Sequence, residues 1–223
     1  MAALLRYAAE GALNAFVASR LWWRGTLAGG LLLLAAVCCG EAMVEACLPL
    51  FHKTFSVLAS EFNVVSIVLD REGADRVVRA TVSLRSPLVI DGRVFFPDPR
   101  GIANASTLIA HALQGPVVML AIALAWPASR LVEHACRVLL LAPLLLALLA
   151  LDVPSVLAGE LWRTVVDALA PGSTSALLGW KSFMQAGGRY ALASAGAIVA
   201  VQGARWLMRR QLPDGQGSAA STT

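Results

Sequence analysis

Charged residues are scarce in this chain, and their scarcity decides its class. Only 14% of the 223 residues are charged, whereas 58% are hydrophobic. A soluble domain of this size could not cover so much apolar surface. The composition excludes an ordinary soluble protein and predicts an integral membrane protein whose first partner is the lipid bilayer.

The basic residues are too dispersed to predict a nucleic-acid-binding patch. The formal net charge is +4, but many of the arginines flank apolar segments. Arginines in such positions set the orientation of membrane helices. We therefore expect no nucleic acid among the partners.

Cysteine and histidine are also too few, and too poorly spaced, for the usual metal or disulfide frameworks. The cysteines are Cys38, Cys39, Cys47 and Cys136, with no C-x-x-C spacing and none within residues 53–104. Only three histidines are present. Structural zinc sites and disulfide scaffolds need regular Cys or His spacings. We expect neither a metal nor another cofactor.

Recognised catalytic signatures are lacking as well. The sequence contains no G-x-S-x-G, no Walker loop and no G-x-G-x-x-G. These motifs mark hydrolase nucleophiles and phosphate-binding loops. Their absence favours a protein that is not an enzyme, although a group of polar residues described below leaves that question open.

Long apolar runs are what the sequence has in abundance. A helix needs about 20 apolar residues to cross the hydrocarbon core of a bilayer. Four segments meet this requirement and predict transmembrane helices, at residues 25–50, 105–127, 138–158 and 190–207. The last of them is rich in Ala and Gly, which allow close helix packing, so we expect it to face protein more than lipid.

Basic residues at the ends of these segments predict the orientation. One side of a four-span arrangement receives an excess of arginines, and cytoplasmic segments retain such an excess. These are Arg6, Arg20, Arg24, Arg130, Arg137, Arg205, Arg209 and Arg210. Both termini are therefore predicted to be cytoplasmic, in an inner membrane if the host is a Gram-negative bacterium.

The cytoplasmic side would hold three short segments. Residues 1–24 predict an amphipathic helix lying on the membrane surface, since Arg6, Glu10 and Asn14 recur at steps of four residues. Residues 128–137 form a loop. Residues 208–223 form a polar tail that we expect to be disordered.

The larger outer segment, residues 51–104, changes to alternating apolar residues and predicts β-strands. "FNVVSIVLD", "DRVVRATVSL" and "PLVIDGRVFFP" are rich in β-branched and aromatic residues. "REGA" can turn the first strand into the second, and "IDGR" is a strong two-residue hairpin signal. We expect a small antiparallel sheet of three or four strands that leans on the membrane, on the other outer segment or on a partner.

The second outer segment, residues 159–189, predicts two short interfacial helices separated at Pro171-Gly172. Its tryptophans and the nearby "FFPDPRG" segment are candidates for contacts with another protein. The candidate partner-binding residues are Phe95, Phe96, Asp98, Arg100, Trp162 and Trp180.

Five polar residues fall at a similar depth in the outer leaflet of this arrangement. They are Glu41, Glu45, His111, Gln114 and Asp152. Polar groups inside a membrane are costly, so such a cluster is a candidate for a metal site, a proton relay or acid–base catalysis. The competing interpretation is that the carboxylates reach headgroup water while His111 and Gln114 bond to a neighbouring helix.

His52 shares a helical stripe with Glu41 and Glu45 in "CCGEAMVEACLPLFH". Proline disfavours an unbroken helix, because it clashes with the carbonyl four residues earlier. We therefore expect Pro49 to interrupt the stripe before His52.

The layout of an anchor, an outer β segment and paired spans, together with "ANASTLIAHALQGPVVMLAIALAWPASR", resembles accessory membrane proteins associated with bacterial exosortases. The resemblance covers about half of the chain. It implies a bacterial inner-membrane protein that works beside an envelope protein-sorting enzyme. The Cys, Arg and His residues of the sorting transpeptidase itself are not arranged here, so that enzyme's activity is not implied.

The sequence thus predicts a non-enzymatic accessory or scaffold protein. It would bind or position components of an envelope complex, namely other membrane or periplasmic proteins, through its outer β segment and interfacial helices. The alternative is a membrane-embedded enzyme, or a proton- or metal-coupled protein, that uses Glu41, Glu45, His111 and Asp152. A transporter is less favoured, because four spans without an inverted repeat would have to oligomerise.

Overall fold

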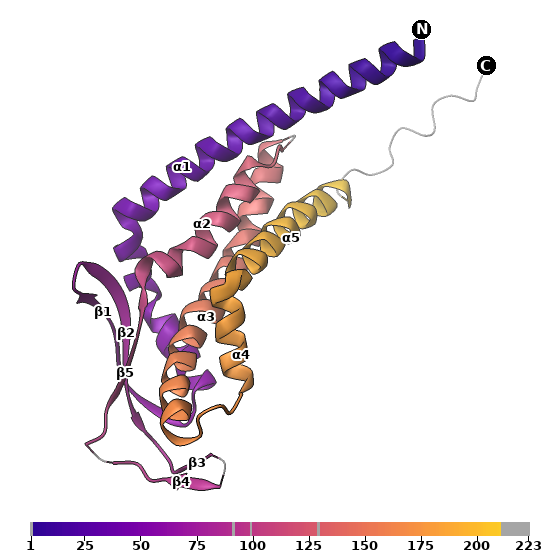
Figure 1. Cartoon of the computed structure of the whole chain (residues 1–223). Coiled ribbons are helices and arrows are strands. Elements are labelled where there is room, and N and C mark those ends of the chain that lie inside the picture. Colours follow the sequence, from indigo (N-terminus) through magenta and orange to yellow (C-terminus); the bar gives the residue numbers. More distant parts are fainter. Residues whose placement is uncertain (1, 91, 99, 129, 211–223) are drawn as a thin grey trace.

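The computed structural model describes residues 2–90, 92–98, 100–128 and 130–210, without the side chains of residues 2–22, 90, 93, 95 and 169. Most of these residues are helical, and a small sheet lies at one end of the helices (Figure 1). The first described helix starts, and the last described helix ends, at the opposite end (Figure 1). We call these the sheet end and the terminal end.

Helix α1, Ala2–Leu58, is one continuous helix of 57 residues. It runs past Pro49 and His52, so the predicted interruption before His52 is wrong, and the helix continues eight residues beyond the predicted span end at residue 50. A proline inside a helix bends it without necessarily ending it. Figure 1 shows α1 changing direction before it ends beside the sheet. The amphipathic face predicted within residues 1–24 lies outside the described side chains.

Helices α2 (Ile109–Ala125), α3 (Leu131–Leu169) and α5 (Arg189–Arg210) pack against one another, and α1 packs along α2 and α3. Helix α3 continues eleven residues beyond the predicted span end at residue 158, into what was expected to be a separate interfacial helix. The predicted loop 128–137 is also shorter, because α3 begins at Leu131. Likewise α5 continues to Arg210, and the predicted disordered segment beyond it lies outside the described residues.

Small residues let α5 pack closely, as its composition predicts. Ala193, Ala197, Ala200 and Ala204 recur at steps of three and four residues and are fully buried. A Cβ placed on Gly196 would lie 2.5 Å from Met119 Cε of α2. One face of α5 therefore meets protein directly, while Val199 and Trp206 on the other side are exposed.

Helix α4, Ala176–Phe183, begins where the Ser175 hydroxyl accepts a hydrogen bond from the Leu178 amide. Such a bond satisfies an amide that the helix leaves unpaired at its start. A π-type turn, η1 (Met184–Gly188), joins α4 to α5. Gly187 has a φ of 116°, a conformation that glycine alone adopts freely, so the chain can change direction there.

The sheet is antiparallel with the order β1-β2-β5. Strands β1 (Phe62–Glu72) and β2 (Asp75–Leu84) form the hairpin predicted at "REGA", with Glu72 opposite Asp75. Strand β5 (Ala103–Leu108) leads directly into α2. The predicted span beginning at residue 105 is therefore wrong at its start, because Ala105–Leu108 pair with β2.

Strands β3 (Leu88–Ile90) and β4 (Arg93–Phe95) form the second hairpin, at the predicted "IDGR". Gly92 has a φ of 77°, as two-residue hairpin turns require. The hairpin lies at the far end of the sheet region from the chain termini (Figure 1).

The sheet packs on the helices through one apolar face. A buried cluster joins the sheet to two helices. The sheet contributes Ile67, Val78 and Ala80, and α1 contributes Phe51 and Phe55. Helix α3 contributes Val153, Leu157, Ala158 and Leu161. Of the supports expected for so small a sheet, the second outer segment contributes Leu161, and most of the remaining contacts come from segments that were not expected to support it. Its supports are the last turns of α1 and the second half of α3.

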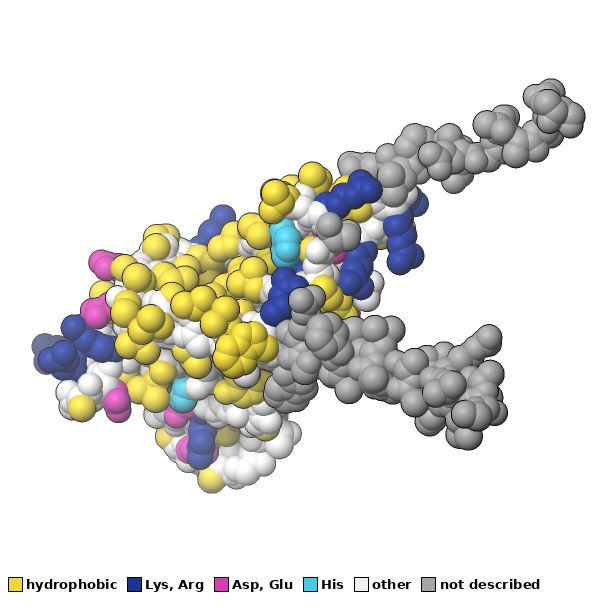
Figure 2. Space-filling model, turned by 90° about the horizontal axis from the view of Figure 1, so that it is seen from above, with side chains coloured by type: hydrophobic (Ala, Val, Ile, Leu, Met, Phe, Trp, Pro, Cys, Tyr) yellow, Lys and Arg dark blue, Asp and Glu magenta, His cyan; other side chains and the backbone are white. Residues whose placement is uncertain are grey.

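Three described segments are long and apolar enough to cross a membrane, namely Trp23–Leu58, Leu131–Ala168 and Ala176–Arg210. Helix α2 is also apolar, but its 17 residues extend only about 25 Å. No Asp, Glu, Lys or Arg lies between Arg24 and Glu41, between Arg137 and Asp152, or between Arg189 and Arg205. A broad hydrophobic surface accordingly separates charged residues at the two ends (Figure 2).

Candidate functional site

Arg189 joins three helices at the sheet end of the hydrophobic belt. Its Nη2 lies 3.5 Å from Asp152 Oδ1 of α3, and its Nη1 donates to the carbonyl of His111 in α2 at 3.0 Å. Arg189 and Asp152 are both buried. Burying two charges in so apolar a place is costly, and each charge is compensated there only because the other lies beside it. Arg189 is thus the partner that the sequence analysis did not identify for Asp152.

Gln114 extends this polar group toward the start of α5. Its Oε1 accepts a hydrogen bond from the Tyr190 hydroxyl at 3.0 Å and lies 3.4 Å from Arg189 Nη1. The prediction that Gln114 bonds to a neighbouring helix is confirmed. Asp152 Oδ2 is buried and has no hydrogen-bond partner among the described residues.

The other predicted cluster members lie elsewhere. Glu41 Oε1 pairs with Arg76 Nη1 of β2 at 3.0 Å, and both side chains are about half exposed. Glu45 and His52 are exposed on α1, and the His111 side chain is exposed on α2. Asp152, Gln114 and the His111 carbonyl therefore meet at Arg189, whereas Glu41, Glu45 and the His111 side chain do not join them. Among the described residues no group of three or more His, Cys, Asp or Glu could hold a metal ion.

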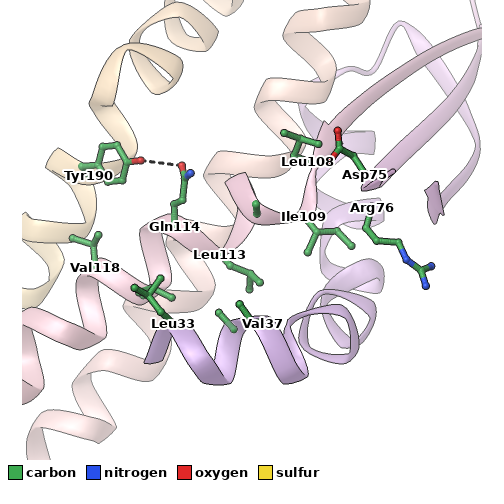
Figure 3. A pocket seen from close by; sticks show the side chains of 13 residues that line it. Leu33, Val37, Asp75, Arg76, Leu108, Ile109, Leu113, Gln114, Val118 and Tyr190 are labelled. Atoms are coloured by element: carbon green, nitrogen blue, oxygen red, sulfur yellow. Dashed lines mark hydrogen bonds between the residues drawn. The ribbon is translucent and has the colours of Figure 1, made fainter. Parts of the chain in front are cut away.

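A groove of about 500 Å³ lies between α1, α2 and the β1–β2 hairpin. Its lining is mainly apolar and includes Leu33 and Val37 of α1 and Ile109, Leu113 and Val118 of α2. Figure 3 shows the Gln114–Tyr190 hydrogen bond at one edge and Arg76 reaching outward at the other. The groove offers apolar contact with a polar margin. It presents no nucleophile paired with a base.

Two of the predicted partner-binding residues are used inside the molecule. Trp162 packs edge-on against Phe62 of β1, with ring centroids 6.4 Å apart. Trp180 donates from Nε1 to the Ser155 hydroxyl of α3 at 3.0 Å and lies against Phe183. Both indoles tie the second helical segment to the rest of the fold.

Of the remaining predicted partner-binding residues, Asp98 alone lines a hollow of about 300 Å³, which we call the sheet-end hollow. Leu88, Ile102 and Ala103 line it from the sheet side, and Val165 and Ala168 line it from α3. Asp98 lies at its edge and accepts a hydrogen bond from the Arg100 amide at 2.9 Å. Phe96 and Arg100 are exposed nearby in sequence, and the side chain of Phe95 lies outside the described residues.

Further ion pairs fix the helices. Lys181 of α4 is buried and pairs with Glu160 of α3. Gly159 of α3 has no side chain and so leaves room for the aliphatic part of Lys181. At the terminal end, buried Arg137 donates to the carbonyls of Ala123 and Trp126, each at 2.7 Å. These bonds satisfy carbonyls that the end of α2 leaves unpaired.

Comparisons of the chain with known protein families, with curated proteins and with solved structures found no match.

Proposed function

We propose that this protein is a non-enzymatic accessory or scaffold protein of a bacterial inner membrane. In this proposal α1, α2, α3 and α5 all span the membrane, both termini are cytoplasmic, and the sheet lies in the periplasm. The sheet region binds and positions another envelope protein. The predicted likeness to exosortase-associated accessory proteins is compatible with this role and stays a prediction.

The observation that carries the proposal is an apolar surface on the β3–β4 hairpin. Val89 and Val94 lie opposite each other in the hairpin and are 68% and 49% exposed. Phe96, two residues beyond Val94, is 75% exposed. A single exposed apolar residue is ordinary, but adjacent ones outside the membrane mark interaction surfaces.

The adjoining sheet-end hollow suggests how a partner would fit. Ile102 is 66% exposed at its margin, and its floor is apolar. An apolar side chain from an extended protein segment fits such a hollow, while Asp98 offers a polar contact in its lining. Interfaces of this kind combine an apolar centre with a charged rim.

Two of the four residues of the competing enzyme interpretation, Glu41 and Asp152, are committed to internal ion pairs. Glu41 is paired with Arg76, and Asp152 is paired with Arg189. These pairs tie the sheet to α1 and α5 to α3. They support a structural role for the carboxylates.

The test is co-purification in a gentle detergent followed by identification of the proteins retained. The double variant Val89→Ser/Phe96→Ser should lose a partner that the natural sequence retains. Val65→Ser, an equally polar change at an exposed valine of β1, is the matched control and should keep it. A monodisperse monomer without any retained protein would contradict the proposal.

The orientation needs a separate measurement. In a cysteine-free background, a membrane-impermeant maleimide added to intact cells should label Phe96→Cys but not Arg209→Cys. The reverse pattern would place the sheet in the cytoplasm.

A further inference from the structure

We propose that the terminal end of the helices binds the phosphate of an anionic phospholipid headgroup. The site is a pocket of about 510 Å³, which we call the arginine pocket. Its lining residues are Pro127, Ala128, Arg130, Glu133, Arg205, Met208 and Arg209.

The charge of the arginine pocket is strongly positive. Three arginines and one glutamate line it. Glu133 is buried and already engaged, since its Oε1 lies 2.9 Å from Arg137 Nη2 and 3.6 Å from Arg205 Nε. The only lining carboxylate is therefore held by two cations. An incoming anion would meet uncompensated guanidinium groups.

Two of the arginines have donors to spare. No hydrogen bond or ion pair joins the side chain of Arg130 or Arg209 to another described residue, and both are exposed. Arg205 contributes one donor to the Pro127 carbonyl at 3.4 Å. A guanidinium presents paired donors that match two phosphate oxygens. The pocket thus offers at least two such forks to one phosphodiester.

The framework of the pocket is fixed rather than loose. Arg137 holds Glu133 and also the last carbonyls of α2, so the α2–α3 connection is anchored from inside. Arg205 lies with its guanidinium carbon 5.8 Å from the centre of the Trp126 ring. This preorganisation reduces the ordering cost of binding.

The depth of the pocket suits a lipid. Trp23 of α1 and Trp206 of α5 lie at this end, as does Trp126 directly after α2, and indoles prefer the membrane–water interface. The uncharged stretch of α3 follows Arg137 in the chain, and that of α5 ends immediately before Arg205. Figure 2 shows basic side chains gathered at this end, beside the hydrophobic surface. Basic pockets between membrane helices bind anionic headgroups in this setting.

The charge pattern also predicts selectivity. A zwitterionic headgroup carries an ammonium group that would need a free carboxylate, but Glu133 is engaged. Phosphatidylglycerol has no such cation. The pocket should therefore prefer phosphatidylglycerol to phosphatidylcholine.

The test uses the full chain in mixed micelles and native mass spectrometry. Equal amounts of phosphatidylglycerol and phosphatidylcholine are offered, and the retained adducts are compared. The double variant Arg130→Gln/Arg209→Gln should reduce the retained phosphatidylglycerol by roughly 30-fold, because each arginine near the surface contributes roughly a five- to sixfold attraction. The control, Arg71→Gln/Arg85→Gln, removes two exposed arginines of the sheet region and should leave retention unchanged.

The outcomes separate the alternatives. Equal loss in both double variants would show attraction by net charge alone and would overturn the proposal. Displacement of the lipid by millimolar inorganic phosphate would assign the pocket to free phosphate and overturn the lipid assignment. Retention that resists phosphate and depends on Arg130 and Arg209 would support the proposal.

Discussion

Arg189 Nη2 lies 3.5 Å from Asp152 Oδ1, and both side chains are buried between α3 and α5. The same guanidinium holds the carbonyl of His111 in α2. One arginine therefore links three helices at the boundary between the hydrophobic belt and the sheet region. A residue in this position is expected to act on stability before anything else.

Replacing Arg189 by Met should leave Asp152 buried without a counterion. The loss of one partner of a buried pair typically costs about 3–5 kcal/mol. Thermal unfolding in detergent should show a marked drop for Arg189→Met. The double variant Asp152→Leu/Arg189→Met should recover much of the loss, since it removes both charges. A double variant no more stable than the single one would argue against the pairing.

Enlarging the alanine stripe of α5 should separate the helices. Ala197→Leu adds volume at a fully buried position, and overpacking typically costs about 1–3 kcal/mol. The matched control is Val199→Leu, because Val199 is 60% exposed on the same helix. Thermal unfolding in detergent should distinguish the two. Equal melting temperatures would contradict the close packing.

Acid should weaken the β1–β2 hairpin through Asp70. The backbone amide of Arg71, followed by the guanidinium of Arg79, holds the pKa of the Asp70 carboxyl below its ordinary value. A carboxyl whose pKa is lowered by folding stabilises the fold above the unfolded pKa, about 3.9, and loses this effect as the pH falls through the folded pKa.

Hydrogen exchange of the β1 and β2 amides between pH 7 and pH 3 measures this effect. Exchange corrected for its intrinsic pH dependence should show lower protection below about pH 4. Asp70→Asn should abolish the loss of β1 and β2 amide protection that Asp70 causes at low pH. Asp167→Asn, a change at an exposed carboxylate of α3, should leave that loss unaltered. An unaltered acid response in Asp70→Asn would refute the assignment.

The β3–β4 turn should depend on Gly92. A residue with a Cβ is strained at a φ of 77° and typically costs about 1–2 kcal/mol there. Gly92→Ala should therefore increase amide exchange at Val94 and weaken retention of the proposed partner. Gly179→Ala is the control, because a Cβ there meets open space within a helix. If Gly92→Ala opens the hairpin but the partner protein is still retained, the binding surface does not include the hairpin.

Local patterns in the sequence predicted what depends on local physics. The "REGA" and "IDGR" turns are found where expected, since turn residues and alternating strands act over a few residues. The buried alanine face of α5 also follows from composition and spacing. The apolar runs likewise predicted helices that are long and apolar enough to cross a membrane.

Long-range contacts decided the remainder. Residues 105–108 look like the start of a membrane helix, but β2 has a free edge that their backbone can pair with. Helix α1 continues past Pro49 because Phe51 and Phe55 are held in the core by the sheet and α3.

In the candidate site, too, the sequence predicted some features and long-range contacts decided others. The sequence marked Asp152 as a candidate site residue or as a carboxylate that reaches headgroup water, but Asp152 is buried and therefore needs a partner. That the partner is Arg189, and that Glu41 turns instead to Arg76, follows only from how α5 and β2 are placed in space. The sequence by itself determined which residues cannot remain in lipid unpaired, because that cost belongs to each side chain. The tertiary structure decided which charges meet, because pairing depends on distances between elements far apart in the chain.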